Sequence, residues 1–452
     1  MEFQKTNKRS NMRTLILFLL PAILLSQSKI LTLENAIKIA LENNNQVKLA
    51  RLEIIKSDEK LIEARSGLIP QITVSGSYSR YLKKPVLFLP PDSPFGRLTG
   101  GVIEIGFDNS YIGLINLQMP LFSWSVYAGI KTANKGRLIA EQAYKSAVLK
   151  TISDVKKSFY GLLLAKEAYK ITQMRIELAE DNLKNVEKLY RQGVASEYDY
   201  INAQVQYQNL QPLLIQAENN LEIAKNALKL VLGIDVKQDI DVEGEMNVDN
   251  LTEIDYSTAL KELYENNPDL KQVEYQVDLS KDLVSLELAG HLPSLFLTGN
   301  FQYQAQANDF NFNQYRWIRT TFVGLQIQIP IFKGFGTQAR VDQAKMSLQQ
   351  TMERMTFTKQ LLENELKNTI YKIEQSKKRI EAQKKAVELA ELGYKIARKR
   401  FESGVGTQLE VSNSELNLAQ AKLNYQQAIY DYLTALSELE KLTGKTNYME
   451  ER

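Results

Sequence analysis

Apolar residues recur every seven positions along two long stretches of this 452-residue chain. The first series is Val155, Leu162, Tyr169, Ile176, Leu183 and Tyr190, and the second is Leu366, Ile373, Ile380, Val387, Tyr394 and Phe401. Such a repeat predicts long α-helices that pack side by side with a left-handed supercoil. Proline is absent between positions 126 and 191, and at 1.5 Å per residue this stretch makes roughly 100 Å of helix.

The two series lie 211 positions apart, and other short motifs repeat in the same order. The turns "YRQGVAS" and "FESGVGT" are also 211 apart, "GLIP" and "GHLP" are 223 apart, and "MPLF" matches "IPIF". We interpret residues 29–234 and 256–445 as two copies of one structural unit. An acidic linker over 235–255 joins them, and a short tail over 446–452 follows.

Each copy contains a pair of runs in which apolar and polar residues alternate, over 71–119 and over 294–329. Ile72 and Val74 alternate with Thr73 and Ser75 in the first pair, for example. This period of two predicts β-strands, and runs of about ten residues match the length of a strand that crosses a bilayer. We expect four prolines to mark the joins between strands and helices, with the second member of each pair ending a strand: Pro70 and Pro120, and Pro293 and Pro330.

The polar face of these strands consists almost entirely of Ser, Thr, Asn and Gln, which suits a water-filled lumen. Tyr, Phe and Trp in the loops between paired strands fit an aromatic girdle at a membrane surface. A half-buried sheet of a soluble protein, with packed aromatic loops, is the alternative interpretation of the same pattern.

A glycine follows each long helix, and a second helix returns. Gly193 and Gly404 are expected to supply left-handed helix caps, and Ser196 and Thr407 to cap the return helices. Pro212 should bend the first return helix. Each copy is then a helical hairpin roughly 100 Å long. An ordinary helix cap is a sufficient explanation of either turn taken alone.

The first 28 residues match a signal peptide, with basic residues before the apolar run "LILFLLPAILL". A retained membrane anchor is the alternative. This segment holds four basic residues and one acidic residue, so its removal lowers the net charge from +3 to 0. A nucleic-acid-binding protein normally keeps a basic excess. We therefore do not expect this chain to bind nucleic acid.

Catalysis and cofactor binding are not expected. The chain has no cysteine and one histidine, His291, which stands between Gly290 and Pro293 without a nucleophile or a set of metal ligands around it. No stretch approaches 18 consecutive apolar residues, as a membrane-spanning helix requires. Four strands cannot close a barrel, and open sheet edges are not tolerated in lipid. A membrane sheet would therefore need strands from several chains, and the strand count fits a dimer or a trimer.

The duplicated layout resembles the TolC-like outer-membrane efflux proteins. The resemblance covers nearly the whole chain and depends above all on "YRQGVASEYDYINAQ" and "FESGVGTQLEVSNSE", with "GLIPQITVSGSYS" and "GHLPSLFLTGNFQ" at the helix-to-strand joins. It implies a mainly α fold with long duplicated hairpins, in which a homotrimer shares a 12-stranded β-barrel in the outer membrane of a Gram-negative bacterium. A periplasmic scaffold without a pore is the alternative.

The resemblance also implies partners and functional residues. A periplasmic adaptor would contact the turns and connect the channel to an inner-membrane pump of the RND, ABC or MFS type. The adaptor-contact motif falls on Gly193, Val194, Ala195 and Ser196, and on Gly404, Val405, Gly406 and Thr407. Acidic positions at the periplasmic entrance correspond to Asp199, Glu410 and Asn413, the last of which departs from the acidic pattern.

Overall fold

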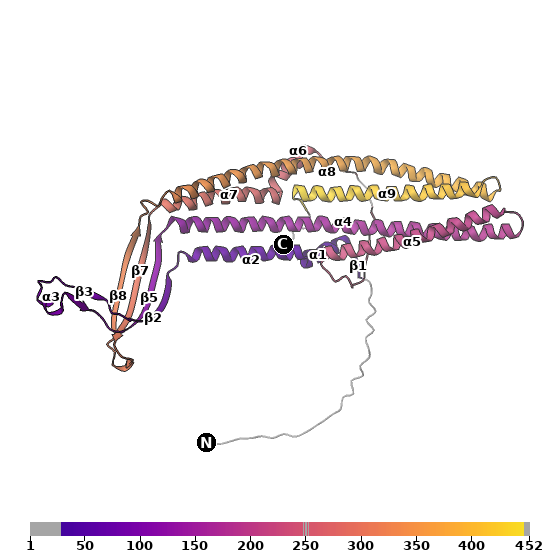
Figure 1. Cartoon of the computed structure of the whole chain (residues 1–452). Coiled ribbons are helices and arrows are strands. Elements are labelled where there is room, and N and C mark those ends of the chain that lie inside the picture. The colour runs from indigo at the N-terminus through magenta and orange to yellow at the C-terminus, as the bar shows by residue number, and fades with distance from the viewer. Residues whose placement is uncertain (1–28, 247, 249–250, 252, 447–452) are drawn as a thin grey trace, which may run out of the picture.

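The computed structural model describes residues 29–246, 248, 251 and 253–446, which form a long helical rod with a sheet at one end and two helical tips at the other (Figure 1). The predicted signal peptide and most of the predicted tail lie outside the described residues. In the described part of the chain, no helix combines the length and the apolar character needed to cross a membrane.

The first half of the chain places two short helices, a strand pair and two long helices in succession. Its elements are β1 (Lys29–Leu31), α1 (Leu33–Asn43), α2 (Asn45–Ser66), β2 (Gln71–Arg80), β3 (Val86–Phe88), α3 (Pro94–Thr99), β4 (Val102–Glu104), β5 (Asn109–Phe122), α4 (Trp124–Arg191) and α5 (Glu197–Leu232).

The second half repeats this order, but its two long strands are not separated by a lobe such as β3, α3 and β4. Its elements are β6 (Ile240–Val242), α6 (Tyr256–Asn266), α7 (Pro268–Leu288), the 3₁₀ turn η1 (Ala289–His291), β7 (Ser294–Ala307), the 3₁₀ turn η2 (Phe312–Gln314), β8 (Ile318–Gln328), α8 (Gly336–Glu402) and α9 (Gln408–Thr443). The fold predicted from the duplicated sequence, long helical hairpins with four strands, is confirmed.

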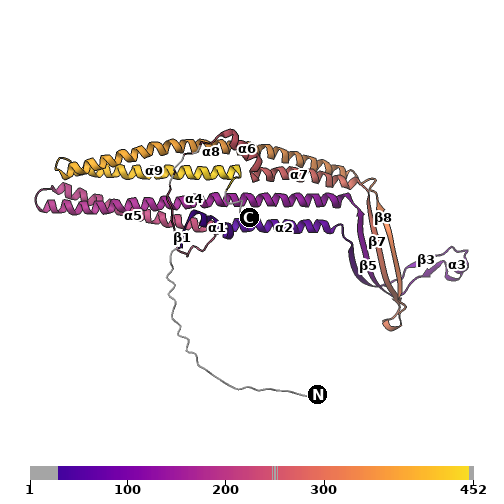
Figure 2. The same cartoon turned by 180° about the vertical axis from the view of Figure 1, so that it is seen from behind.

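The long helices α4 and α8 have 68 and 67 residues, which corresponds to about 100 Å each. Residues of the seven-residue repeat are buried near the middle of both, including Val155, Leu162, Leu366 and Ile373. The return helices α5 and α9 have 36 residues each. They are therefore shorter than the roughly 100 Å expected for each hairpin. Helices α2 and α7 pack along the rest of α4 and α8 (Figures 1 and 2).

An asparagine and a glycine join the return helix to the first helices of each copy. The side-chain amide of Asn44 donates to the carbonyl oxygen of Val231 at 2.7 Å, and its Oδ1 accepts from the first turn of α2. Gly233 ends α5 with a φ of 69°, and a Cβ there would lie 2.5 Å from the carbonyl oxygen of Asn43. Asn267 and Gly444 repeat the arrangement in the second copy. This junction divides the residues between 33 and 66 into the two helices α1 and α2.

The four long strands form one antiparallel sheet in the order β2-β5-β7-β8. Each strand pair comes from one copy, and β5 and β7 join the two copies. The pairing Asn116↔Asn300 across that join is reinforced by a hydrogen bond of 2.9 Å between their side-chain amides. Strands β2 and β8 are the outer edges of the sheet in the described part of the chain.

The prediction that Pro120 ends its strand is wrong. Strand β5 continues to Phe122 because β7 lies beside it, and Pro120 pairs with Phe296. Pro70 and Pro293 immediately precede β2 and β7. Pro330 lies just beyond β8, which ends at Gln328.

One face of the sheet is apolar and the other is mainly polar, as the alternation predicts. Pairings such as Ile72↔Leu117 and Leu297↔Leu325 align apolar residues, and Thr73↔Asn116 aligns polar ones. Five apolar residues interrupt the polar face: Ile112, Leu114, Phe296, Ile318 and Phe322. At the loop end, aromatic rings gather in pairs 4.9–5.6 Å apart, namely Tyr78, Tyr111, Tyr303, Phe312, Tyr315 and Trp317.

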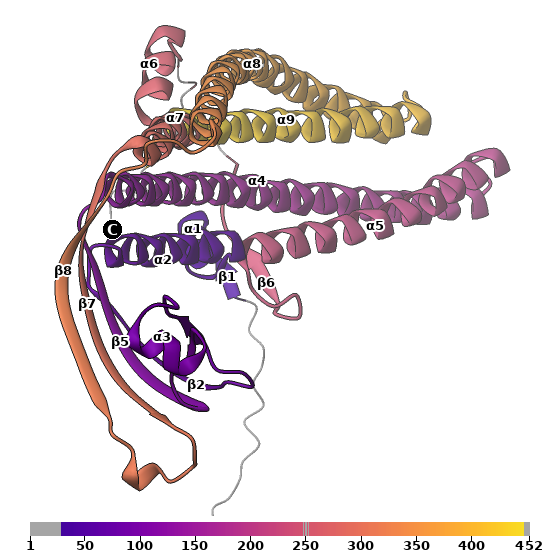
Figure 3. The same cartoon turned by 60° about the vertical axis from the view of Figure 1, so that its left-hand side comes forward.

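Two small sheets were not predicted. β1 and β6 pair in parallel, so the stretch expected to be only a linker contributes a strand, and Leu31 and Ile240 join the core around Val155 and Leu162. β3 and β4 pair beside α3 in a lobe that projects from the far end of the long sheet (Figure 3).

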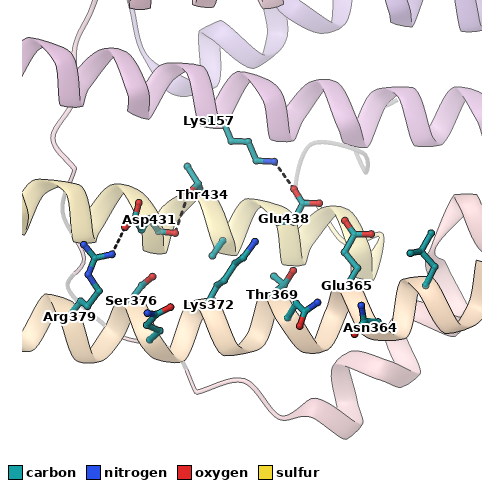
Figure 4. A pocket seen from close by; sticks show the side chains of 14 residues that line it. Lys157, Asn364, Glu365, Thr369, Lys372, Ser376, Arg379, Asp431, Thr434 and Glu438 are labelled. Carbon is teal, nitrogen blue, oxygen red and sulfur yellow. Dashed lines mark hydrogen bonds and ion pairs between the residues drawn. The ribbon is translucent and has the colours of Figure 1, made fainter.

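Ion pairs connect the two copies at mid-length, in a groove between α4, α8 and α9 (Figure 4). Lys157 on α4 donates to Glu438 on α9 at 2.5 Å, and Lys441 also pairs with Glu438. Burial opposes ionisation of Glu438, but the hydrogen bonds from Lys157 and Lys441 outweigh it and lower its pKa to about 2. Burial raises the pKa of the nearby Glu365.

The lowered pKa gives Glu438 a pH-dependent contribution to stability. Its ordinary pKa is 4.5, so the stabilisation is fully present above about pH 4.5 and is lost as the pH falls toward 2. We expect Glu438→Gln to lower the free energy of unfolding by about 2 kcal/mol at pH 7. The difference from wild type should shrink over that acid range, in unfolding curves followed by circular dichroism.

Glu34→Gln is the matched control, because Glu34 forms an exposed pair with Lys38 on one helix, worth about 0.5 kcal/mol or less. A loss for Glu438→Gln that is independent of pH between 4.5 and 2 would contradict the assignment.

Candidate functional site

The first tip is a glycine-capped turn between α4 and α5. Gly193 has a φ of 75°, and its amide donates to the carbonyl oxygen of Tyr190 at 2.9 Å. The amides of Val194 and Ala195 both donate to the carbonyl oxygen of Leu189. These bonds satisfy the last carbonyl groups of α4, so the predicted left-handed cap is confirmed.

The return helix of this tip begins with a capping box. The amide of Asp199 donates to Ser196 Oγ at 3.1 Å, while the Asp199 carboxylate accepts from the amide and the hydroxyl of Ser196. Tyr190 and Tyr200 stack across the hairpin at 5.4 Å. The Asp199 carboxylate therefore helps to fix its own turn.

The second tip repeats the glycine cap of the first. Gly404 has a φ of 74°, the amides of Val405 and Gly406 donate to the carbonyl oxygen of Arg400 at 3.0 Å, and Thr407 Oγ1 accepts from the Glu410 amide at 3.2 Å. A Cβ at Gly406 would lie 3.0 Å from the backbone nitrogen of Phe401. The first copy has Ala195 at the matching position, so only the second turn lacks a side chain there.

Both tips present an apolar side chain to solvent. Val194 is 72% exposed and Val405 is 73% exposed. A Cβ at Gly193 or Gly404 would have no heavy atom within 4 Å, so side chains added there would also project outward. Both tips lie at the same end of the rod (Figure 1), and each exposes a valine beside its glycine turn.

The predicted entrance residues lie on the return helices. The Glu410 carboxylate is 3.8 Å from the Arg400 guanidinium, and both side chains are about half exposed. Asn413 is exposed and lines a groove between the two hairpins. Glu410 and Asn413 belong to α9, and Asp199 belongs to α5, where its carboxylate accepts from Ser196.

Sequence reasoning missed a charged pair in this groove. Arg175 Nε on α4 lies 4.0 Å from Glu415 Oε1 on α9, and both side chains are largely buried. Burial raises the pKa of Glu415, and the charge of Arg175 opposes that rise. Nearby, Ser412 donates to Gln206 at 3.0 Å. A single sequence carries no signal for contacts between residues this far apart.

Comparison with known proteins agrees with this architecture. The outer membrane efflux protein profile matches residues 36–234 and 259–445. The alkaline protease secretion protein AprF of Pseudomonas aeruginosa is 24% identical over 96% of this chain and 89% of its own length. The outer membrane protein TolC of Vibrio cholerae is 23% identical over 74% of each chain.

The fold is also similar to that of a solved channel. The crystal structure of the Campylobacter jejuni CmeC outer membrane channel superposes with a TM-score of 0.75 at 21% identity, over 91% of this chain and 85% of that one. Because the profile matches most of both copies, the chain belongs to the outer membrane efflux protein family.

Proposed function

We propose that three copies of this chain form an export channel through the outer membrane of a Gram-negative bacterium and continue as a helical tunnel into the periplasm. The observation that carries the proposal is the sheet. It exposes an apolar face, and its two edge strands have no partner in the described part of the chain. A lipid environment would cover that face, and neighbouring copies would pair the edges.

The polar face of the sheet then lines the pore. Its Ser, Thr, Asn and Gln side chains suit water, as in barrels that enclose an aqueous channel. Three copies of the four-stranded sheet supply twelve strands, which makes a barrel wide enough for a lumen. The long helices leave the sheet on one side and would continue the same passage.

The tips are proposed to dock a periplasmic adaptor, which connects the channel to an inner-membrane pump. Their exposed valines and glycine turns support this role, because they offer a compact apolar surface at the end farthest from the sheet. In this arrangement the chain is a passive duct and not an enzyme. Its relatives are named for protease secretion and for an outer membrane protein, and a duct carries what its pump delivers.

Fractionation tests the channel against a periplasmic scaffold. We expect the protein in the outer-membrane fraction, migrating on detergent gels as an oligomer that heating dissociates. Recovery as a soluble periplasmic protein would overturn the proposed function.

Substitutions at the tip glycines test adaptor docking. Gly193→Trp and Gly404→Trp place a bulky side chain on the docking surface, and we expect export to fall by about tenfold, equivalent to 1.4 kcal/mol of docking free energy. The added side chains meet no other part of the chain, but the positive φ of both glycines strains the turn when tryptophan replaces them. Oligomer formation and conductance in planar bilayers must therefore be retained for the loss of export to report on docking.

Gly193→Asn and Gly404→Asn are matched controls, because asparagine tolerates the left-handed backbone that these turns require. They should export better than the tryptophan variants. Wild-type export by both tryptophan variants would exclude these turns as the docking site.

Glu410 is proposed to favour cations at the periplasmic entrance, where three carboxylates would surround one axis. Glu410→Gln should lower the cation-to-anion permeability ratio by about two- to fivefold, equivalent to ~0.5–1 kcal/mol of screened electrostatic free energy. Reversal potentials in planar bilayers under a salt gradient measure this ratio.

Arg400→Gln provides a control with the opposite sign. It removes the cation beside Glu410 and should raise cation preference, while the Arg400 carbonyl oxygen still accepts its bonds from the turn. Unchanged selectivity in Glu410→Gln would remove this residue from the entrance.

A further inference from the structure

The outer strands β2 and β8 expose nearly all of their residues. Every residue of β2 is exposed, and in β8 only Gly324 is partly covered. Ile72, Val74, Val323 and Leu325 are each 64–77% exposed. Two free antiparallel edges of similar length on one sheet are complementary to each other, because each offers unpaired backbone N–H and C=O groups.

The internal duplication is preserved at the level of strand register. The first strands of the two repeats, β2 and β7, are related by the 223 positions between Pro70 and Pro293. The second strands, β5 and β8, are related by the 210 positions between Phe122 and Phe332. These offsets convert the observed pair Gln71↔Gln118 into Ser294↔Gln328, which is also observed. At the other end they convert Arg80↔Asn109 into Tyr303↔Arg319, again observed.

The β5–β7 join can therefore be carried over to the free edges. It pairs β5, the second strand of the first internal repeat, with β7, the first strand of the second repeat. Strand β8 is the second strand of the second repeat, so it should pair in the same way with the first strand of the next chain, β2. The offsets convert Asn116↔Asn300 into Gln326 opposite Ser77. We propose that β8 of one chain pairs with β2 of the next chain in this inherited register.

The faces of the sheet agree with this register. It places Leu325 opposite Tyr78 of the next chain on the apolar face, and Gln326 opposite Ser77 and Gln328 opposite Ser75 on the polar face. A slip of one residue would place the apolar residues of one strand beside the polar residues of the other. A slip of two residues would keep the faces, and only an experiment separates it from the inherited register.

The same transfer accounts for an exposed apolar segment after β8. In the first copy, β7 holds β5 in strand pairing as far as Phe122, which pairs with Leu295. The matching Phe332 is 73% exposed, and Ile331 before it is 95% exposed. The inherited register places Phe332 opposite Ile72 of the next chain. Pairing between chains would therefore extend β8 past Pro330 and cover this segment.

Engineered cysteines test the register, which depends on the proposed assembly of several copies. The chain has no cysteine, so any disulfide is designed. S77C and Q326C in one chain cannot bridge each other internally, because three strand spacings of about 4.8 Å separate β2 from β8. Between chains, the inherited register brings their Cα atoms to about 4.5–5.5 Å.

Mild oxidation of membranes that contain S77C/Q326C should yield disulfide-linked oligomers on non-reducing gels run after heating. The slipped pairs S75C/Q326C and S79C/Q326C should yield far less, because two residues of displacement carry the Cα atoms beyond about 7 Å. N116C/N300C controls for oxidation, since it should close a disulfide within one chain without forming oligomers.

Equal or stronger crosslinking by a slipped pair would overturn the register while leaving the oligomer in place. An unheated oligomer that none of the three pairs crosslinks would also overturn it. Monomeric protein in unheated, reduced samples would instead overturn the proposed function, and the inference with it.

Discussion

The unpaired backbone groups at the edges of the β2–β5–β7–β8 sheet determine how this chain can exist in a membrane. In hydrocarbon each unsatisfied N–H or C=O costs several kcal/mol, so a membrane sheet with free edges has no stable form as a single chain. Closure by further copies satisfies these groups and also fixes how the attached helices are placed around a common axis. The proposed assembly, its lumen and its ring of tips thus follow from one requirement.

The long helices connect the sheet rigidly to the tips, so closure of the sheet also determines where the tips lie. Only Ser123 separates β5 from α4, and α4 then runs without interruption to the first turn. The Asn44–Gly233 and Asn267–Gly444 junctions join each return helix to its own copy. The ion pairs around Glu438 join α9 to α4, so the two hairpins extend as one rod.

Much of the fold could be predicted from the sequence, because its strongest signals are periodic. The seven-residue repeat, the glycine turns and the alternating strands all appear in the structure. The end of β5 was mispredicted at Pro120, because a proline can continue a strand whose neighbour does not need its N–H. The β1–β6 sheet was also missed, since it pairs segments far apart in the chain. The return helices are shorter than expected because they end at the local caps Gly233 and Gly444.

The candidate site was less accessible to sequence reasoning. The caps formed by Ser196 and Thr407 are local and were predicted. The ion pairs Lys157–Glu438 and Arg175–Glu415 join residues more than 200 positions apart. No local sequence pattern indicates such pairs. The docking role of the tips and the entrance role of Glu410 depend on partners and on neighbouring copies, so they stay predictions.

Closure of the sheet by several copies is tested by the number of chains in the unheated, detergent-solubilised protein. Native mass spectrometry measures that number without relying on activity, on an adaptor or on a pump. If neighbouring copies pair the edges of the β2–β5–β7–β8 sheet, the measured complex contains three chains. A protein that remains a single chain when extracted gently from the membrane would contradict it.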